Sequence, residues 1–279
     1  MIQTLKHLYR KITYRYSLDE VNLRNTDCIR IYWWRDKLNF GDNLNKDLIS
    51  KLSGKSVVWS RNNSNIQFYT GAGSIIQLIN DNAIVWGSGL ISGKSRPVFP
   101  PKAILAVRGP LTRQRLESLG IATPAIYGDP ALLLPKFYQT KSKKKYKIGI
   151  IPHFIDKHYL DLRKQLPETM NIIDIQEKDI QLFIDRVNEC EYILSSSLHG
   201  MIIADAFKIP SARVIFTGNP IGGDFKFHDY CLSVDRKVFK AVDLSRKTLD
   251  ESLLNLKYEL GNINSEALLE SCPFYIENL

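Results

Sequence analysis

The stretch ILSSSLHGMIIADAF, residues 193–207, decides the fold class. An apolar run ends in three serines, His199-Gly200 follows, and a second apolar run then continues with helical spacing. This order predicts a buried strand, a polar turn and a helix. Two interpretations of the junction are open. Either Ser197 caps the helix and His199 is a surface residue of its first turn, or His199 is the centre of a site.

The same order of strand, turn and helix recurs on both sides of a lysine-rich stretch, residues 140–147. Strands that alternate with helices predict an α/β fold with mainly parallel sheets. We therefore expect an N-terminal α/β domain over residues 1–139, a linker over 140–147 and a C-terminal α/β domain over 148–279. The last helix is expected to pack back on the N-terminal domain.

Polar and glycine-rich turns follow the predicted strands in both halves. In parallel sheets ligands bind beyond the carboxyl ends of the strands, where these turns lie, and two such domains facing each other enclose a cleft. Gly41 permits a tight turn, and Gly73 and Gly89 belong to turns whose backbone can approach a ligand closely. Neither glycine-rich turn matches a dinucleotide-binding or Walker motif, so close packing is the alternative interpretation.

Three charged residues of the first half follow predicted strands. Asp42 is interpreted first as a helix cap and second as a carboxylate in the cleft, able to take a proton from a hydroxyl. Asp129 precedes a proline and is a turn signal before it is a buried carboxylate. Arg108 ends a strand, and its planar guanidinium suits paired contacts with a carboxylate or a phosphate.

The second half adds further candidates. Gly200 lies in the first turn of a predicted helix, where alanine would be more favourable by roughly 0.5–1 kcal/mol, so a close approach to its backbone is expected. His153 is either an ordinary loop histidine or a residue of the same cleft. The segment GGDFKFHDY, residues 222–230, is predicted to be a loop that closes over a ligand, with Lys226 supplying positive charge.

The composition narrows the classes of partner. The 279 residues carry a formal net charge of +9, with 44% hydrophobic and 24% charged residues, as in soluble globular proteins. A positive chain favours phosphates, anionic polysaccharide or lipid head groups, and because it lacks a nucleic-acid motif we expect no nucleic-acid partner. The four cysteines are far apart, which predicts reduced thiols in the cytoplasm and neither a disulfide framework nor a zinc site.

Residues 2–12 carry apolar side chains at helical spacing among basic residues, and they lack the apolar core of a secretory signal. Such a helix either packs on its own domain or rests on an anionic membrane surface as a peripheral contact.

Four motifs, in this order, resemble the polysaccharide pyruvyl transferases, and among them the exopolysaccharide ketal-pyruvate branch. They are NFGDNLNKDL (39–48), AVRGPLTRQRLESLGI (106–121), YGDPALLLP (127–135) and SSSLHGMIIADAFKIPS (195–211). The resemblance implies a GT-B-like fold, in which two Rossmann-like domains face a cleft, with the acceptor on the N-terminal and the donor on the C-terminal side. It implies phosphoenolpyruvate as donor, a pair of sugar hydroxyls as acceptor and a pyruvate ketal as product. It also implies work at the cytoplasmic face of the membrane, on lipid-linked repeat units or related precursors.

The resemblance also suggests roles for the residues. His199 would be the acid or the phosphate contact, and Asp42 the base toward the acceptor. The remaining donor-binding candidates are Arg108, Lys226, Ser197, Gly200 and His153, and the acceptor-binding candidates are Asn39, Gly41, Gly73 and Asp129. Neither a metal nor a cofactor is expected.

One departure from the family pattern concerns Ser197. Many members carry an arginine two residues before the histidine, where this chain has Ser197. Another cation must then hold the donor, and Arg108 and Lys226 are the candidates, with Arg113 behind them. Otherwise the protein has lost activity or changed donor. Two alternative hypotheses remain. One is a nucleotide-sugar glycosyltransferase on the same two-domain architecture, and the other, which Ser197 favours, is a non-catalytic protein that binds carbohydrate or anions.

Overall fold

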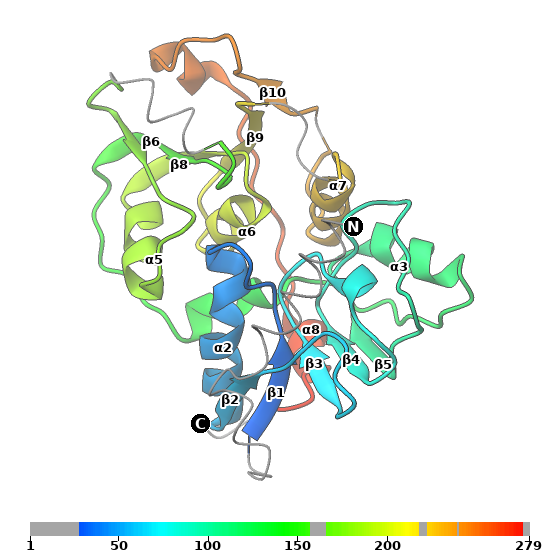
Figure 1. Ribbon diagram of the computed structural model, residues 1–279. Coiled ribbons are helices and arrows are strands. Elements are labelled where there is room, and N and C mark those ends of the chain that lie inside the picture. Colours follow the sequence, from blue (N-terminus) through cyan, green and yellow to red (C-terminus); the bar gives the residue numbers. More distant parts are fainter. Residues whose placement is uncertain (1–27, 157–165, 218–221, 239, 276–279) are drawn as a thin grey trace, which may run out of the picture.

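The computed structural model describes residues 28–156, 166–217, 222–238 and 240–275, and it shows an α/β protein with two parallel five-stranded sheets (Figure 1). The predicted N-terminal helix over residues 2–12 lies outside these described residues. None of the helices in the described ranges has both the length and the apolar composition that crossing a bilayer requires.

The first sheet has the strand order β2-β1-β3-β4-β5, and every adjacent pair is parallel. Its strands are β1 (Cys28–Tyr32), β2 (Ser56–Trp59), β3 (Phe68–Thr70), β4 (Ala83–Trp86) and β5 (Ala103–Ala106). The elements that cover this sheet or follow it are α2 (Phe40–Ser53), η2 (Ile76–Leu78), α3 (Pro110–Glu117) and η3 (Pro130–Lys136).

The second sheet has the order β10-β9-β8-β6-β7 and is also parallel throughout. Its strands are β6 (Tyr146–Ile151), β7 (Met170–Ile172), β8 (Cys190–Ser195), β9 (Ser211–Ile215) and β10 (Val242–Asp243). Its helical elements are α5 (Ile180–Asn188), α6 (Leu198–Ala206), α7 (Phe225–Ser233) and η4 (Glu251–Asn255), and α8 (Glu266–Glu270) lies near the C-terminus.

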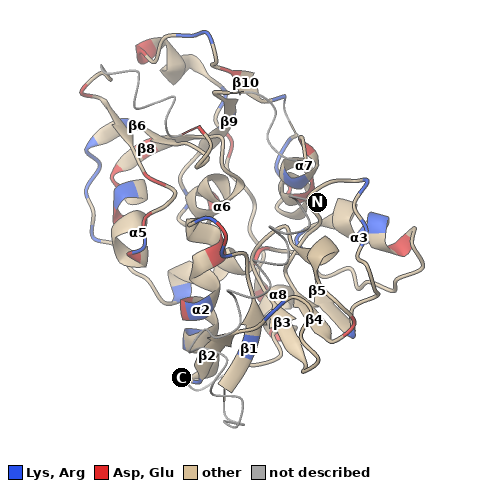
Figure 2. Ribbon diagram, in the orientation of Figure 1, with Lys and Arg blue, Asp and Glu red and all other residues tan. Residues whose placement is uncertain are grey.

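Helix α6, the helix of the opening stretch, lies between the two halves. All nine of its residues are buried, it contains no Lys or Arg, and its ribbon carries no blue in Figure 2. It packs on β8 and β9 of its own sheet and also on η3 of the first half. Because all its residues are buried, it shows no solvated polar face, as expected for an interior helix.

Side chains of both halves belong to one hydrophobic core. The rings of Phe40 on α2 and Phe183 on α5 stack with their centroids 4.0 Å apart. The backbone N–H of Phe40 also donates to the carbonyl of Ile175, at 2.8 Å. The C-terminal segment packs on the first sheet, where the Trp86 indole donates to the carbonyl of Leu268 at 2.9 Å. The contacts of Phe40 with Phe183 and Ile175 join the two halves at the carboxyl ends of β1 and β7.

Two sequence predictions are wrong in this region. Residues 225–233 form helix α7 instead of a loop, because Phe227, Tyr230 and Cys231 recur at helical spacing and are buried together. Asp42 does not cap α2, because Asn39 occupies the N-cap position and its side chain accepts from the N–H of Gly41 at 3.1 Å. Asp42 lies in the first turn of α2 with its side chain buried.

Candidate active site

A cavity of about 680 Å³ lies where the two halves meet. Both halves contribute to its wall, and the lining includes Trp34, Asn39, Asp42, Ser74, Ile91, His153, Phe154, Ser197, His199 and Lys226. The cavity is thus at the carboxyl ends of strands from both sheets, where parallel α/β sheets bind their ligands.

Asp42 is fixed in the wall by the packing of α2 on the turn after β3. Asn45 ties the two together: its side-chain amide donates to the carbonyls of Asp42 and Ala72, at 2.9 and 3.0 Å, and its oxygen accepts from the N–H of Ala72 at 2.8 Å. Gly73 has φ +134°, a conformation that favours glycine, and a Cβ there would lie 3.2 Å from the Asp42 carboxylate.

The charge of Asp42 is strongly affected by its surroundings. Burial raises the pKa of this carboxyl to about 6, while His199 and Lys226 act to lower it and Asp129 adds to the increase. The predicted catalytic pair, Asp42 and His199, therefore lies within electrostatic reach in the structure. A carboxyl with this pKa is a base of suitable strength for chemistry near neutral pH.

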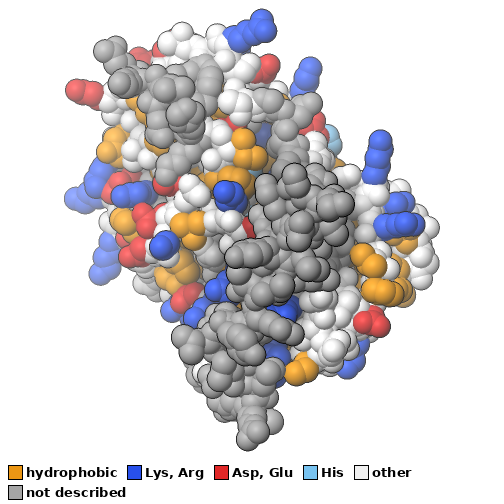
Figure 3. All heavy atoms as spheres, viewed as in Figure 1, with side chains coloured by type: hydrophobic (Ala, Val, Ile, Leu, Met, Phe, Trp, Pro, Cys, Tyr) orange, Lys and Arg blue, Asp and Glu red, His pale blue; other side chains and the backbone are white. Residues whose placement is uncertain are grey.

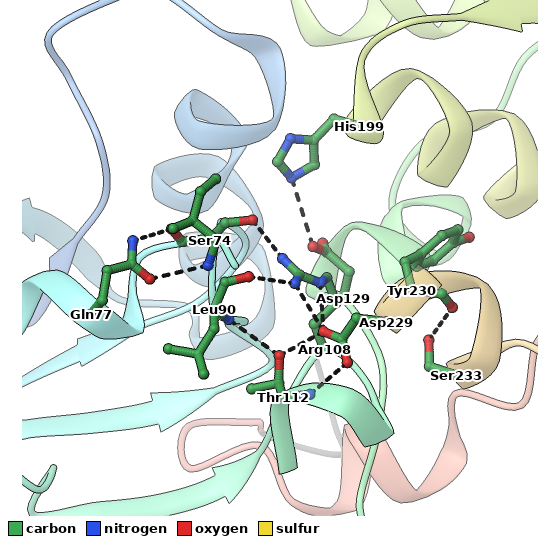
Figure 4. A network of polar contacts seen from close by, with 11 residues as sticks. Ser74, Gln77, Leu90, Arg108, Thr112, Asp129, His199, Asp229, Tyr230 and Ser233 are labelled. Carbon is green, nitrogen blue, oxygen red and sulfur yellow. Dashed lines mark hydrogen bonds and ion pairs between the residues drawn. The ribbon is translucent and has the colours of Figure 1, made fainter. Parts of the chain in front are cut away.

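His199 enters from the opposite half, at the start of α6, and packs against the backbone of α2. A Cβ on Gly41 would lie 1.9 Å from Cγ of His199, so the imidazole occupies the space that a side chain at residue 41 would need. Nε2 of His199 points toward Oδ2 of Asp129, 3.7 Å away (Figure 4). Both atoms are buried and lack a hydrogen-bond partner among the described residues.

Asp129 has two different roles through its two oxygens. Oδ1 accepts from the N–H of Ala131 at 3.0 Å and so caps η3, which is the turn role that the sequence suggested. Oδ2 faces His199. The carboxylate is also buried, with 1% of its surface exposed, so both sequence interpretations hold at once.

Lys226 and His153 line the cavity from the second half. The side chain of Lys226 is buried, and burial together with the nearby Arg108 and Arg213 guanidinium groups lowers its pKa to about 8. Burial and the Lys226 ammonium lower the pKa of His153 to about 4, which keeps that imidazole uncharged at neutral pH. Lys226 is thus a cation that the cavity itself contains.

Arg108 lies behind the cavity wall and is fully buried. Its guanidinium forms an ion pair with Asp229 at 2.9 Å, donates to the carbonyl of Leu90 at 2.8 Å and reaches Ser74 Oγ at 2.5 Å (Figure 4). Asp229 also accepts from the N–H and the hydroxyl of Thr112, at 2.8 and 2.6 Å. The arginine proposed as a donor contact therefore anchors α7 to the first half.

Ser197 and Gly200 differ from what their sequence positions suggested. Ser197 occupies the N-cap position of α6, but within the described residues its side chain makes no capping hydrogen bond. A Cβ on Gly200 would lie 2.3 Å from Ser195 Oγ and 2.9 Å from Cγ2 of Ile151. The close approach expected at Gly200 is therefore made by the protein's own sheet.

The structure brings most of the predicted residues to one place. Asn39, Asp42, His153, Ser197, His199 and Lys226 line the cavity, and Gly41, Gly73 and Asp129 contact those side chains. Sequence reasoning missed Asp229, which gave no signal beyond its place in residues 222–230. It also missed Trp34 and Phe154, whose positions just after strands were a usable signal. In the described ranges, no three His, Cys, Asp or Glu side chains converge as a metal site would require.

Comparison with known proteins agrees with these motifs. The family model for polysaccharide pyruvyl transferase matches residues 2–215. The chain is 32% identical over 225 residues to the uncharacterized protein L143 of Acanthamoeba polyphaga mimivirus, covering 76% of this chain and 77% of that protein.

A second relative comes from a bacterium. The chain is 30% identical over 213 residues to the succinoglycan biosynthesis protein ExoV of Rhizobium meliloti (strain 1021), which covers 71% of this chain and 62% of that protein. No solved structure matches the chain significantly. The family match spans most of the chain and includes the four motifs over residues 39–48, 106–121, 127–135 and 195–211, and the protein therefore belongs to the polysaccharide pyruvyl transferase family and is a transferase.

Proposed function

We propose that the protein transfers the enolpyruvyl group of phosphoenolpyruvate onto two hydroxyls of one sugar in a cell-surface or exopolysaccharide precursor. The products are a pyruvate ketal and inorganic phosphate. The observation that carries the proposal is the meeting of His199, from the second half, with Asp42 and Asp129, from the first, at one cavity that also contains Lys226. The relative named for succinoglycan biosynthesis supports an exopolysaccharide precursor as acceptor.

The proposed reaction is balanced without any co-reactant. A proton adds to the methylene carbon of the donor, which becomes a methyl group and leaves cationic character on the adjacent carbon. One sugar hydroxyl adds to that carbon and gives up its proton. The bond between this carbon and the phosphate oxygen breaks, and the second hydroxyl adds, so that its proton leaves with the phosphate. The sequence of steps needs an acid, a base and groups that hold an anion.

The residues have the following roles in this proposal. Asp42, with its pKa raised to about 6, accepts the proton of the attacking hydroxyl. His199 supplies the proton or contacts the phosphate. Lys226 takes the place of the family arginine that Ser197 replaces, because it lines the cavity whereas the guanidinium of Arg108 is bound to Asp229. His153, uncharged at neutral pH, contributes hydrogen bonds to the donor without adding charge.

Each half of the chain has its own role in this reaction. Residues 1–139 hold the acceptor and residues 148–279 hold the donor, on either side of the stretch 140–147, in a GT-B-like pair of domains. The reaction takes place in the cytoplasm, at the inner face of the membrane when the acceptor is linked to a lipid. Neither a metal nor a cofactor takes part, and nucleic acid is not a partner.

The test is incubation with phosphoenolpyruvate and a panel of galactose-, glucose- and mannose-type acceptors. We expect phosphate release that depends on the acceptor. The mass of the product should exceed that of the acceptor by one pyruvate group attached as a ketal. His199→Ala should abolish turnover with an unchanged circular dichroism spectrum. His228→Ala, a histidine on α7 outside the lining of this cavity, should leave turnover intact.

Two results would contradict the proposal. Transfer from a nucleotide sugar without use of phosphoenolpyruvate indicates a glycosyltransferase. Binding of the donor or the sugar without turnover, under every acceptor tested, indicates a non-catalytic relative.

A further inference from the structure

The loop between β4 and β5 exposes two apolar side chains at its tip. The second part of this loop has the sequence ISGKSRPVFPPK, residues 91–102. Val98 is 73% exposed and Phe99 is 53% exposed, and these are the two most exposed large hydrophobic side chains of the described residues. Adjacent apolar side chains held in water are unfavourable, and such exposure marks an interaction site.

The loop is held in place at both sides of this tip. Pro97, directly before Val98, is buried. The carbonyl of Ser95 accepts from the Arg115 guanidinium of α3 at 3.0 Å, and the N–H of Lys102 donates to the carbonyl of Ala83 at 2.9 Å. Pro100 and Pro101 restrict the backbone immediately after the tip. Val98 and Phe99 are therefore presented by a fixed loop.

The charged residues of the stretch 91–102 are all basic. Lys94, Arg96 and Lys102 are exposed, and residues 91–102 contain no Asp or Glu. On the α3 side of Figure 3, hydrophobic side chains lie beside lysine and arginine side chains. An apolar tip flanked along the chain by exposed cations matches the boundary of an anionic bilayer, where the tip enters the acyl region and the cations contact lipid phosphates.

The stretch 91–102 begins at the cavity. Ile91, its first residue, lines the cavity and donates its N–H to Gln77 Oε1, at 3.2 Å. Gly93 lies against Phe225 at the start of α7, where an added Cβ would be 3.1 Å from the ring. A bilayer bound by the tip is thus joined to the cavity wall through seven residues of a fixed loop, from Ile91 to Pro97.

We propose that the loop over residues 91–102 docks the protein on an anionic phospholipid bilayer. Val98 and Phe99 insert below the head groups, and Lys94 and Arg96 contact the lipid phosphates. The docking does not depend on the proposed reaction. If that reaction is correct, the docking brings the cavity to the surface that carries a lipid-linked acceptor.

The test uses the full chain and vesicles of phosphatidylcholine with or without phosphatidylserine, in a sedimentation assay without phosphoenolpyruvate or sugar. The variant is Val98→Ser with Phe99→Ser. The matched control is Ile66→Ser with Leu182→Ser, which removes two other exposed apolar side chains, 45% and 39% exposed. We expect the loop variant to bind the anionic vesicles at least about tenfold more weakly and the control to bind like the wild type.

A second variant tests whether Lys94 and Arg96 contact the lipid phosphates. Lys94→Gln with Arg96→Gln should weaken binding to the anionic vesicles by about tenfold or more and leave binding to pure phosphatidylcholine unchanged, and added salt should reduce the difference. The inference is overturned if the wild type does not bind the anionic vesicles. It is also overturned if the loop variant binds like the wild type, because another part of the chain then carries the contact. Neither result bears on whether the protein uses phosphoenolpyruvate.

Discussion

Oδ2 of Asp129 and Nε2 of His199 face each other 3.7 Å apart, and neither atom has a hydrogen-bond partner among the described residues. They come from opposite halves of the protein, Asp129 from the N-cap of η3 and His199 from the first turn of α6. A relative shift of about 1 Å would bring them within hydrogen-bond distance. Asp129 would then hold the proton of His199 on Nε2 and fix the orientation of the ring.

Asp129→Asn tests this relationship. The amide retains an oxygen for the N–H of Ala131 but removes the charged acceptor from His199. We expect kcat to fall by about 100-fold with little change in the KM for phosphoenolpyruvate, because the general acid–base step loses its orienting group. Steady-state kinetics with Asp81→Asn, an exposed aspartate, as control measure the effect. A kcat within twofold of the wild type would show that Asp129 does not act through His199.

Gly41→Ala tests whether the position of the His199 ring matters, because the added methyl group displaces the ring through a steric clash. The new methyl group would lie 1.9 Å from Cγ of His199, so the imidazole must move away from its place between α2 and Asp129. We expect a loss of kcat comparable to that of His199→Ala, about 100-fold or more. Lys46→Ala, on the exposed face of the same helix, should behave like the wild type. Retained activity in Gly41→Ala would mean that the ring position is not critical.

The pH profile of kcat/KM should have two limbs. Activity should fall as the pH drops below about 6, because the buried Asp42 carboxyl becomes protonated and no longer accepts a proton. It should also fall as the pH rises above about 8, because Lys226 loses the charge that holds the anionic donor. Rates measured from about pH 5 to about pH 9, a range that includes both pKa values, should show both limbs.

Two variants assign the limbs. Lys226→Met should remove the alkaline limb and raise the KM for phosphoenolpyruvate, and Asp42→Asn should remove the acid limb together with most of the rate. An alkaline limb that persists in Lys226→Met belongs to another group and argues against Lys226 as the donor cation.

Asp229→Ala should destabilise the protein, although Asp229 itself does not line the cavity. It leaves the Arg108 guanidinium buried without its carboxylate and removes the acceptor of two hydrogen bonds that Thr112 donates. We expect the free energy of unfolding to fall by about 3–5 kcal/mol, as for other buried ion pairs that lose one partner. Urea denaturation measures this change. The double variant Arg108→Met/Asp229→Leu should recover part of the loss, and an unchanged midpoint in Asp229→Ala would show that the pair contributes little.

The sequence by itself determined the α/β class, the parallel sheets and the turns that carry Asp42 and His199. The physical reason is that buried side chains recur at a short, regular spacing along a strand or a helix, and a polar turn interrupts this pattern. The pattern and the turn can therefore both be recognised in a few consecutive residues. It did not identify α7 as a helix, because the glycines just before it, Gly222 and Gly223, and its own mixed polar residues resembled a loop.

Only the tertiary structure decided which side chains face each other. Arg108 and Asp229 are 121 residues apart and Asp129 and His199 are in different halves, so no local pattern relates them. Whether a buried charge anchors a helix or lines a cavity depends on the partner that packing brings to it. For this reason Arg108, a donor candidate by sequence, is an anchor in the structure, and Lys226 is a buried cation that lines the cavity.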